Sequence, residues 1–200
     1  MDAEGFVMAG GLSSRMGRDK ALVELAGRPL VAWALDALRG AGLMARIAGA
    51  RADLSAFALV VPDEAVDTGP LSGVCSALRQ TERDWAAFVT VDQPLIPPAL
   101  ISFLIEHARL TGASVTVASL NGFAQTFPAV VRRDALPVLR AELDAGRAGA
   151  FAAFASAGVR VVPVEMVPVQ DERGWPAYRW FWNVNTPGEL QRLVGVLRAG

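Results

Sequence analysis

The sequence predicts an α/β protein of three layers, with helices covering both faces of a mostly parallel, twisted sheet. Short apolar runs alternate with longer segments of helical period along the 200 residues, and a glycine-rich turn follows the first run directly. Such alternation is typical of βαβ units, whose strands are parallel and buried on both faces. No boundary divides the pattern, so we expect a single domain spanning residues 1–200.

The expected strands are short and apolar, at residues 5–8, 46–50, 58–61, 86–91, 114–119, 127–131, 159–164 and 180–184. The expected helices cover residues 29–38, 70–79, 98–108, 133–143, 148–157 and 187–197. Several of them begin at proline, which suits a first helical turn because its missing N–H is not needed there. The runs 88–91 and 159–162 are expected to be central strands. Ligands of such sheets bind beyond the carboxyl ends of the strands, so the loops after strands carry the site.

Composition excludes several classes of protein. Hydrophobic residues make up 52% of the chain, and a net charge of −1 argues against a nucleic-acid binder with a broad basic surface. Cys75 is the only cysteine, so we expect a small buried side chain with neither a disulfide nor a thiolate zinc site. The chain opens without a signal-peptide pattern, and its apolar runs are too short to span a membrane, which predicts a cytoplasmic location.

The segment 8–20, MAGGLSSRMGRDK, predicts a phosphate site. Adjacent Gly10 and Gly11 leave no Cβ between backbone N–H groups and a ligand, and successive N–H groups form a concave anion site. Arg15 and Lys20 follow on the same loop and can neutralise a triphosphate, whereas Arg18 is expected to be solvated. The spacing matches neither the Walker loop nor the dinucleotide-binding fingerprint.

The same segment resembles the signature L-A-G-G-x-S-x-R-M-G-x-D-K of nucleotidyltransferases that activate sugars and cofactors, with Met8 in place of leucine. Further matches are DTGPLSG at 67–73, DQP at 92–94, FPAV at 127–130 and NVNTPGEL at 183–190. Together they cover the whole chain and resemble the MobA family of molybdenum cofactor guanylyltransferases. The resemblance implies a Rossmann-like nucleotidyltransferase fold.

The resemblance also implies an activity, the transfer of GMP from GTP to molybdopterin with release of pyrophosphate. It assigns catalysis to Arg15, Lys20 and Asp92, with Asp92 as the ligand of Mg²⁺, an ion that suits a lone carboxylate at a strand end. It assigns nucleotide binding to Met8, Ala9, Gly10, Gly11, Lys20, Asp63 and Asp92. It implies transient contacts with proteins that deliver molybdopterin or receive the product.

Other roles stay open at the level of sequence. Asn183 and Asn185 could hold the second substrate or a metal-bound water, but capping the helix that starts near Pro187 is an equal alternative for Asn185. His107, the only histidine, is expected near a helix end and not in catalysis.

The nucleotide base also stays open. Gly10 stands where cytidylyltransferases of the same cofactor carry alanine, which favours a purine, and Asp63 could accept from guanine N1–H and N2–H. The asparagine of the family's N-A-N-R element is missing, because residues 48–51 read AGAR. Transfer of CMP, transfer to a sugar phosphate, and a non-catalytic nucleotide-binding domain are the alternatives.

Overall fold

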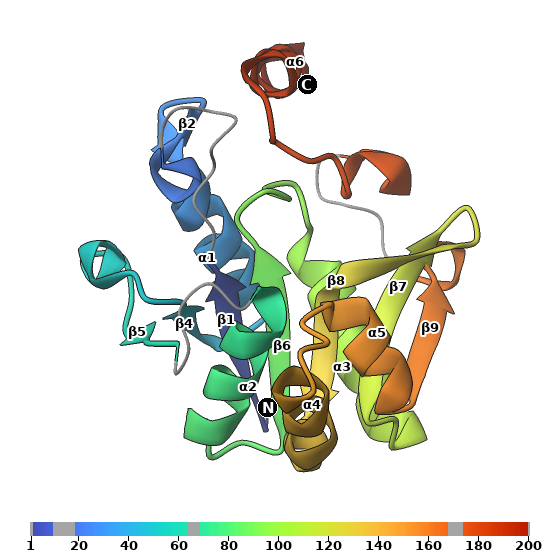
Figure 1. The fold of residues 1–200 in the computed structure, drawn as a ribbon. Coiled ribbons are helices and arrows are strands. Elements are labelled where there is room, and N and C mark those ends of the chain that lie inside the picture. The colour runs from blue at the N-terminus through green and yellow to red at the C-terminus, as the bar shows by residue number, and fades with distance from the viewer. Residues whose placement is uncertain (1, 10–18, 64–68, 168–173, 200) are drawn as a thin grey trace.

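The computed structural model describes residues 2–9, 19–63, 69–167 and 174–199. Its main feature is a seven-stranded sheet with the order β5-β4-β1-β6-β8-β7-β9, shown in Figure 1. Every neighbouring pair is parallel except those of β8, which runs antiparallel to β6 and β7. The strands are β1 (Ala3–Met8), β4 (Met44–Ala48), β5 (Val60–Val61), β6 (Trp85–Thr90), β7 (Val115–Leu120), β8 (Phe123–Arg132) and β9 (Val159–Pro163). The predicted α/β class is confirmed.

Helices pack on both faces of this sheet because side chains alternate along its strands. Phe6 and Phe88 face a core shared with α2 (Pro70–Gln80), α4 (Leu136–Asp144) and α5 (Ala150–Ser156). The next residues along, Val7 and Val89, face a second core shared with α1 (Leu30–Gly40) and α3 (Pro98–Thr111). The three-layer arrangement follows from this period of two. The sixth helix, α6 (Pro187–Ala199), lies beyond the carboxyl edge of the sheet near β2 (Figure 1).

The helices start close to where the prolines predict. Pro70 and Pro98 stand in the first turns of α2 and α3, and Pro187 begins α6. The segment predicted as one helix over 133–143 is divided into a 3-10 turn, η3 (Arg133–Ala135), and α4, which has a proline in its first turn.

Two predictions about strands are wrong. Residues 180–184 form no strand and follow a 3-10 turn, η5 (Ala177–Arg179). Their apolar side chains are buried because this connection packs into the core, where Val184 is fully buried. The run at 159–162 belongs to β9, an edge strand and not a central one, and Val161 in it is 41% exposed. In these two segments, an apolar run neither ensured that the residues form a strand nor showed whether a strand is central.

A small antiparallel hairpin was not predicted. Its strands β2 (Glu24–Leu25) and β3 (Arg28–Pro29) are joined by Ala26 and Gly27, both at positive φ. Two residues at positive φ match the twist of a tight hairpin, but alanine is an unusual choice for the first of them. The Ala-Gly pair therefore gave a weak signal in the sequence.

The part of the chain that the structure describes holds no helix long and apolar enough to cross a membrane. The cytoplasmic location and the single domain stay predictions. Cys75 is buried, as expected.

Candidate functional site

Four neighbouring parallel strands end at the same edge of the sheet and carry the predicted site residues there. Met8 is the last residue of β1, and Ala9 follows it with its N–H bonded to the carbonyl of Ala48 at the end of β4. Asp63 follows β5, and Asp92 follows β6. The carboxyl ends of these strands therefore lie along one edge of the sheet, as parallel strands require. Gly10, Gly11 and Arg15 lie outside the described residues.

Lys20, Asp92 and Asn185 form a cluster of polar side chains at this edge. The ammonium nitrogen Nζ of Lys20 lies 3.3 Å from Oδ2 of Asp92 and donates to Oδ1 of Asn185 at 2.5 Å. The Lys20 side chain is 15% exposed and that of Asp92 is 29% exposed, so the cation is largely shielded while the carboxylate is accessible. Lys20 is the only lysine of the sequence, and all other residues among its 19 Lys and Arg are arginine. A compact ammonium group at this position is thus distinct from every other cation of the chain.

The placement of Lys20 follows from a short capped turn. The 3-10 helix η1 (Lys20–Leu22) begins after Asp19, whose Oδ1 accepts from the N–H of Ala21 at 3.0 Å. Ala21 is 1% exposed and anchors the turn in the core. The cap fixes the start of the turn, and the buried methyl fixes its orientation.

The placement of Asn185 follows from a capping box at the start of α6. Oγ1 of Thr186 accepts from the N–H of Glu189 at 3.2 Å, while Oε2 of Glu189 accepts from the N–H groups of Asn185 and Thr186 at 2.8 and 2.9 Å. The bond from the Asn185 N–H is the main reason why the pKa of Glu189 lies below its usual value. Thr186 therefore caps the helix, and the side chain of Asn185 is left to bind Lys20. Capping of the helix by Asn185 is therefore not observed, and its role toward the second substrate or a metal-bound water stays a prediction.

One backbone bond ties this segment to the strand that carries Asp92. The N–H of Val184 donates to the carbonyl of Asp92 at 2.8 Å. Asn183, one residue earlier, is exposed, and its side chain makes no hydrogen bond with the described residues of the cluster. The structure thus brings Asn185 to the cluster and leaves Asn183 outside it.

Asp63 forms a second, apolar part of the edge together with Met8 and Gly73. Its Oδ1 is buried and has no hydrogen-bond partner among the described residues, and burial raises the pKa of this carboxyl group. A Cβ added to Gly73, in the first turns of α2, would lie 2.7 Å from Cε of Met8 and 3.3 Å from Oδ1 of Asp63. A larger side chain would crowd both neighbours, so Gly73 is a residue of the edge that the sequence reasoning quoted in a motif but did not assign.

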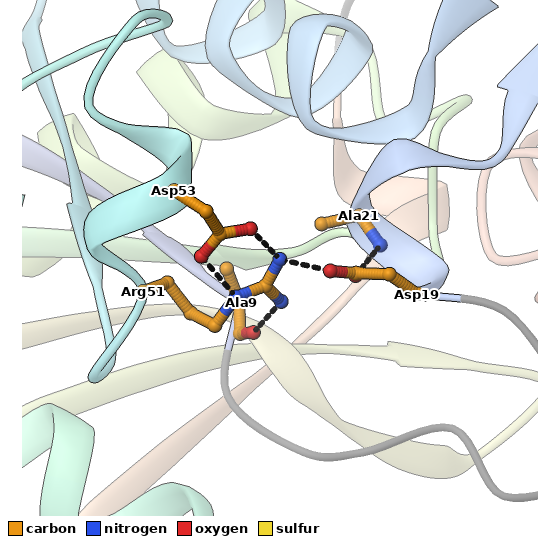
Figure 2. A network of polar contacts seen from close by, with 5 residues as sticks. All are labelled: Ala9, Asp19, Ala21, Arg51 and Asp53. Carbon is orange, nitrogen blue, oxygen red and sulfur yellow. Dashed lines mark hydrogen bonds and ion pairs between the residues drawn. The ribbon is translucent and has the colours of Figure 1, made fainter.

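Arg51 is a second residue that the sequence reasoning did not assign. It ends the segment AGAR, where an asparagine was expected, and its guanidinium group contacts Asp19, Asp53 and the carbonyl of Ala9 (Figure 2). Its sequence position alone gave no sign of these contacts, because Asp19 lies 32 residues away.

The oxygen atoms of the Lys20 cluster suit a magnesium ion. The described residues contain no group of three or more His, Cys, Asp or Glu side chains able to hold a metal. Mg²⁺ does not need such a group, since it is commonly held by one or two carboxylates, with waters and substrate phosphates completing its shell. Asp92, accessible and next to an amide oxygen, fits this mode of binding.

A family model and the sequences of curated relatives show which family the chain resembles. The model of the MobA-like NTP transferase domain matches residues 5–161. The molybdenum cofactor guanylyltransferase of Vibrio atlanticus is 31% identical over 191 residues, covering 94% of this chain and 93% of that protein. The protein of the same name from Rhizobium meliloti is 32% identical, covering 93% and 88%. Among solved structures, molybdopterin-guanine dinucleotide biosynthesis protein A from Archaeoglobus fulgidus has a TM-score of 0.81 at 20% identity and covers 98% of this chain and 100% of that one, which shows the shared fold.

Proposed function

The chain belongs to the MobA-like NTP transferase family, and we propose that it transfers GMP from GTP to the phosphate of molybdopterin. The products are pyrophosphate and the guanine dinucleotide form of the cofactor. The names of relatives that match nearly the whole chain support this choice of substrates.

The observation that carries the proposal is the meeting of Lys20 with Asp92 and Asn185. These residues are separated by 72 and 165 positions in sequence, yet they converge at the edge where ligands of such sheets bind. A cation, a carboxylate and an amide gathered from three segments suit a polyanionic substrate better than a structural role on the surface.

The reaction is an in-line displacement at phosphorus. A phosphate oxygen of molybdopterin forms a bond to the α-phosphorus of GTP, the bond from that phosphorus to the bridging oxygen breaks, and pyrophosphate leaves with the electron pair. Because two polyanions must approach each other, positioning and charge neutralisation dominate such catalysis. We assign Lys20 to the phosphates that become pyrophosphate, and Arg15 to the same phosphates on the strength of the family signature.

We assign Mg²⁺ to Asp92, whose carboxylate would hold the ion, and we assign Asn185 to the orientation of Lys20. When bound, the ion would neutralise phosphate charge. Lys20 pairs with Asp92 when no nucleotide is present, so the nucleotide phosphates compete with this carboxylate for the lysine. Their arrival would leave Asp92 open to the ion.

We assign the guanine base to Asp63. Its unpartnered, buried Oδ1 is an acceptor that lacks a donor, and guanine presents two donors, N1–H and N2–H, on one edge. The glycine at position 73 places no side chain against this oxygen, whereas a Cβ there would lie 3.3 Å from it. Met8 and Ala9, beside it at the end of β1, complete the proposed nucleotide site.

The test is a turnover assay that follows pyrophosphate release with GTP, Mg²⁺ and molybdopterin. We expect Lys20→Ala and Asp92→Asn to lower turnover by about a hundredfold or more, as the loss of one preorganised charge in a phosphoryl-transfer site does. Asp36→Asn is the matched control, since it removes a carboxylate from an exposed ion pair with Arg28. Near-normal turnover in either site variant removes the role given to that residue.

The choice of base is tested separately, with GTP, CTP, ATP and UTP under the same conditions. Stabilisation by CTP and not by GTP would overturn the guanylyl assignment while keeping nucleotidyl transfer. Tight GTP binding without pyrophosphate release in the presence of molybdopterin would favour a nucleotide-binding domain without this activity.

A further inference from the structure

Arg51 joins three segments of the chain through one guanidinium group. Its Nε and Nη2 donate to the two carboxylate oxygens of Asp53 at 2.9 and 2.7 Å, and its Nη1 donates to the carbonyl of Ala9 at 3.3 Å. Nη2 also pairs with Oδ2 of Asp19. Figure 2 shows the guanidinium between the carboxylates of Asp53 and Asp19, with Ala9 beside it. Only 18% of the Arg51 side chain is exposed, against 52% for that of Asp53.

The contacts with Ala9 and Asp19 matter because these two residues flank the glycine-rich segment. Ala9 directly precedes residues 10–18, and Asp19 directly succeeds them. The second carboxylate oxygen of Asp19 caps the turn η1, which begins with Lys20. One chain of contacts therefore runs from Arg51 through Asp19 to the backbone N–H of Ala21, the residue after Lys20 in the same turn.

Arg51 is itself poorly suited to bind a phosphate. Two carboxylates face its single charge, and each of its nitrogens donates to a protein oxygen. The hydrogen bond from Arg51 is also the main reason why the pKa of Asp53 lies below its usual value, so both partners stay charged. The arrangement depends on the planar fork of a guanidinium, which a lysine cannot reproduce.

We propose that Arg51 is a positioning residue of the nucleotide site, which holds Ala9 and Asp19 together and thereby sets the place of Lys20. The role rests on the proposed function, because it assumes that Lys20 meets the nucleotide phosphates. The arginine acts through the backbone, and not through contact with the ligand.

The test uses the fact that Lys20 is the only lysine of the sequence. Protein labelled with carbon-13 in lysine gives one side-chain CεHε signal in an NMR spectrum, and this signal reports the surroundings of the Lys20 ammonium without any substrate. We expect Arg51→Ala and Arg51→Lys both to move this signal away from its wild-type position. We also expect both variants to raise the dissociation constant of the nucleotide about tenfold or more, the size expected for the loss of charged hydrogen bonds.

Arg132 provides a matched control. It also bonds the carboxylate two residues later, with Nε to Oδ1 of Asp134 at 2.6 Å, and a distant carbonyl, that of Gly112, at 3.1 Å. It is paired with Trp85 at the start of β6, at the other end of the strand from Asp92. Arg132→Ala is therefore expected to leave both the Lys20 signal and nucleotide binding unchanged.

If the Arg51 variants fail to fold, Asp19→Asn tests whether the Arg51–Asp19 contact sets the position of Lys20. Asparagine keeps a capping oxygen for the turn but loses the ion pair, so we expect a smaller shift of the Lys20 signal in the same direction. An unchanged Lys20 signal in folded Arg51 variants overturns the proposal; if nucleotide binding is weakened all the same, Arg51 contacts the ligand directly. A shifted signal in a protein that does not use GTP supports the positioning role and overturns the proposed function alone.

Discussion

The side chain at position 20 is an ammonium group, and its size and shape matter as well as its positive charge. Its ammonium lies between an accessible carboxylate and an amide oxygen, at 3.3 and 2.5 Å. A guanidinium is larger and planar and spreads its charge over a fork, so it cannot occupy the same position between these two oxygens. Every other residue among the 19 Lys and Arg of this sequence is arginine, so the lysine at this position stands out.

We therefore predict that Lys20→Arg does not restore what Lys20→Ala loses. Turnover should fall about tenfold or more below wild type although the charge is kept, because the new side chain displaces Asn185 or Asp92. The measurement is kcat/KM for pyrophosphate release, with the melting temperature as a check on folding. Wild-type turnover in Lys20→Arg would mean that only the positive charge matters.

A second residue-scale prediction concerns Asp63, whose pKa is raised by burial. The carboxyl group of Asp63 therefore binds its proton more tightly in the folded state than in the unfolded chain. The free energy of unfolding should fall as pH rises through the folded pKa, because the group then ionises in a buried place. Asp63→Asn should therefore be more stable than wild type at pH 7, by about 1 kcal/mol or less given the solvent exposure of the group. The difference should shrink as pH falls below the unfolded pKa.

The same variant should bind GTP more weakly, because the amide presents a donor where guanine also presents donors. Urea unfolding at several pH values and nucleotide titration measure the two effects. A stability difference that does not depend on pH would contradict the role of burial in the pKa of Asp63. Unchanged GTP affinity would contradict the assignment of Asp63 to the guanine base. Asp144→Asn, at the end of α4, is the control for a surface carboxylate.

At the scale of elements, the first turn of α6 connects helix stability to the site. Thr186→Ala removes the capping hydroxyl and should destabilise α6 by about 1 kcal/mol, with faster amide exchange in the helix. Turnover should fall as well, because Asn185 precedes the cap directly. Thr111→Ala is the control, since it removes a hydroxyl bonded to the His107 carbonyl at the end of α3, which carries no site residue. Equal loss of turnover in both variants would indicate a general effect of destabilisation.

The capping box also predicts a response to acid. The hydrogen bonds that lower the pKa of Glu189 stabilise the folded state at pH values above the unfolded pKa of this group. That stabilisation is lost as pH falls through the folded pKa. Glu189→Ala should therefore make the amide exchange of α6 less dependent on pH between about 3 and 6, the range around an ordinary glutamate pKa. An unchanged pH dependence would contradict the role of this carboxylate.

The elements that the sequence predicted well are those with strong local signals. Strand β6 is a continuous apolar run followed by Asp92, and the helices start at prolines, so both the carboxylate and its edge were predictable. The connection at 180–184 was not, because an aromatic and β-branched run has the same composition whether it joins a sheet or is buried under a loop. The edge position of β9 depends on topology and not on its own residues.

The individual site residues were predictable by type, but their partners were not. Lys20 and Asp92 stand in recognisable motifs, yet the sequence did not show that Thr186 would cap the helix and that the Asn185 side chain would contact Lys20. The Arg51 contacts join residues from three separate segments, and local sequence carries no record of such contacts. These partners became evident only from the folded arrangement of the chain.

At the scale of the whole molecule, binding of nucleotide and metal should be linked. Because Lys20 pairs with Asp92 in the free protein, Mg²⁺ alone should raise the melting temperature little. GTP with Mg²⁺, at about a hundred times its dissociation constant, should stabilise by about 2.7 kcal/mol, or roughly 5–10 °C for a chain of this size. In Lys20→Ala, Mg²⁺ alone should have a larger effect than in wild type. A large shift with Mg²⁺ alone in wild type would contradict the linkage.

The contact between Lys20 and Asn185 has a consequence for how the protein is made. It joins residues 165 positions apart, so it closes a loop that contains most of the chain. A growing polypeptide that has reached α5 already contains Lys20 and Asp92, but it does not yet contain the asparagine that binds the lysine. Since a chain is synthesised from its N-terminus, the site is completed only after Asn185 has been added. Until then, Lys20 and Asp92 are present without the amide that binds the lysine.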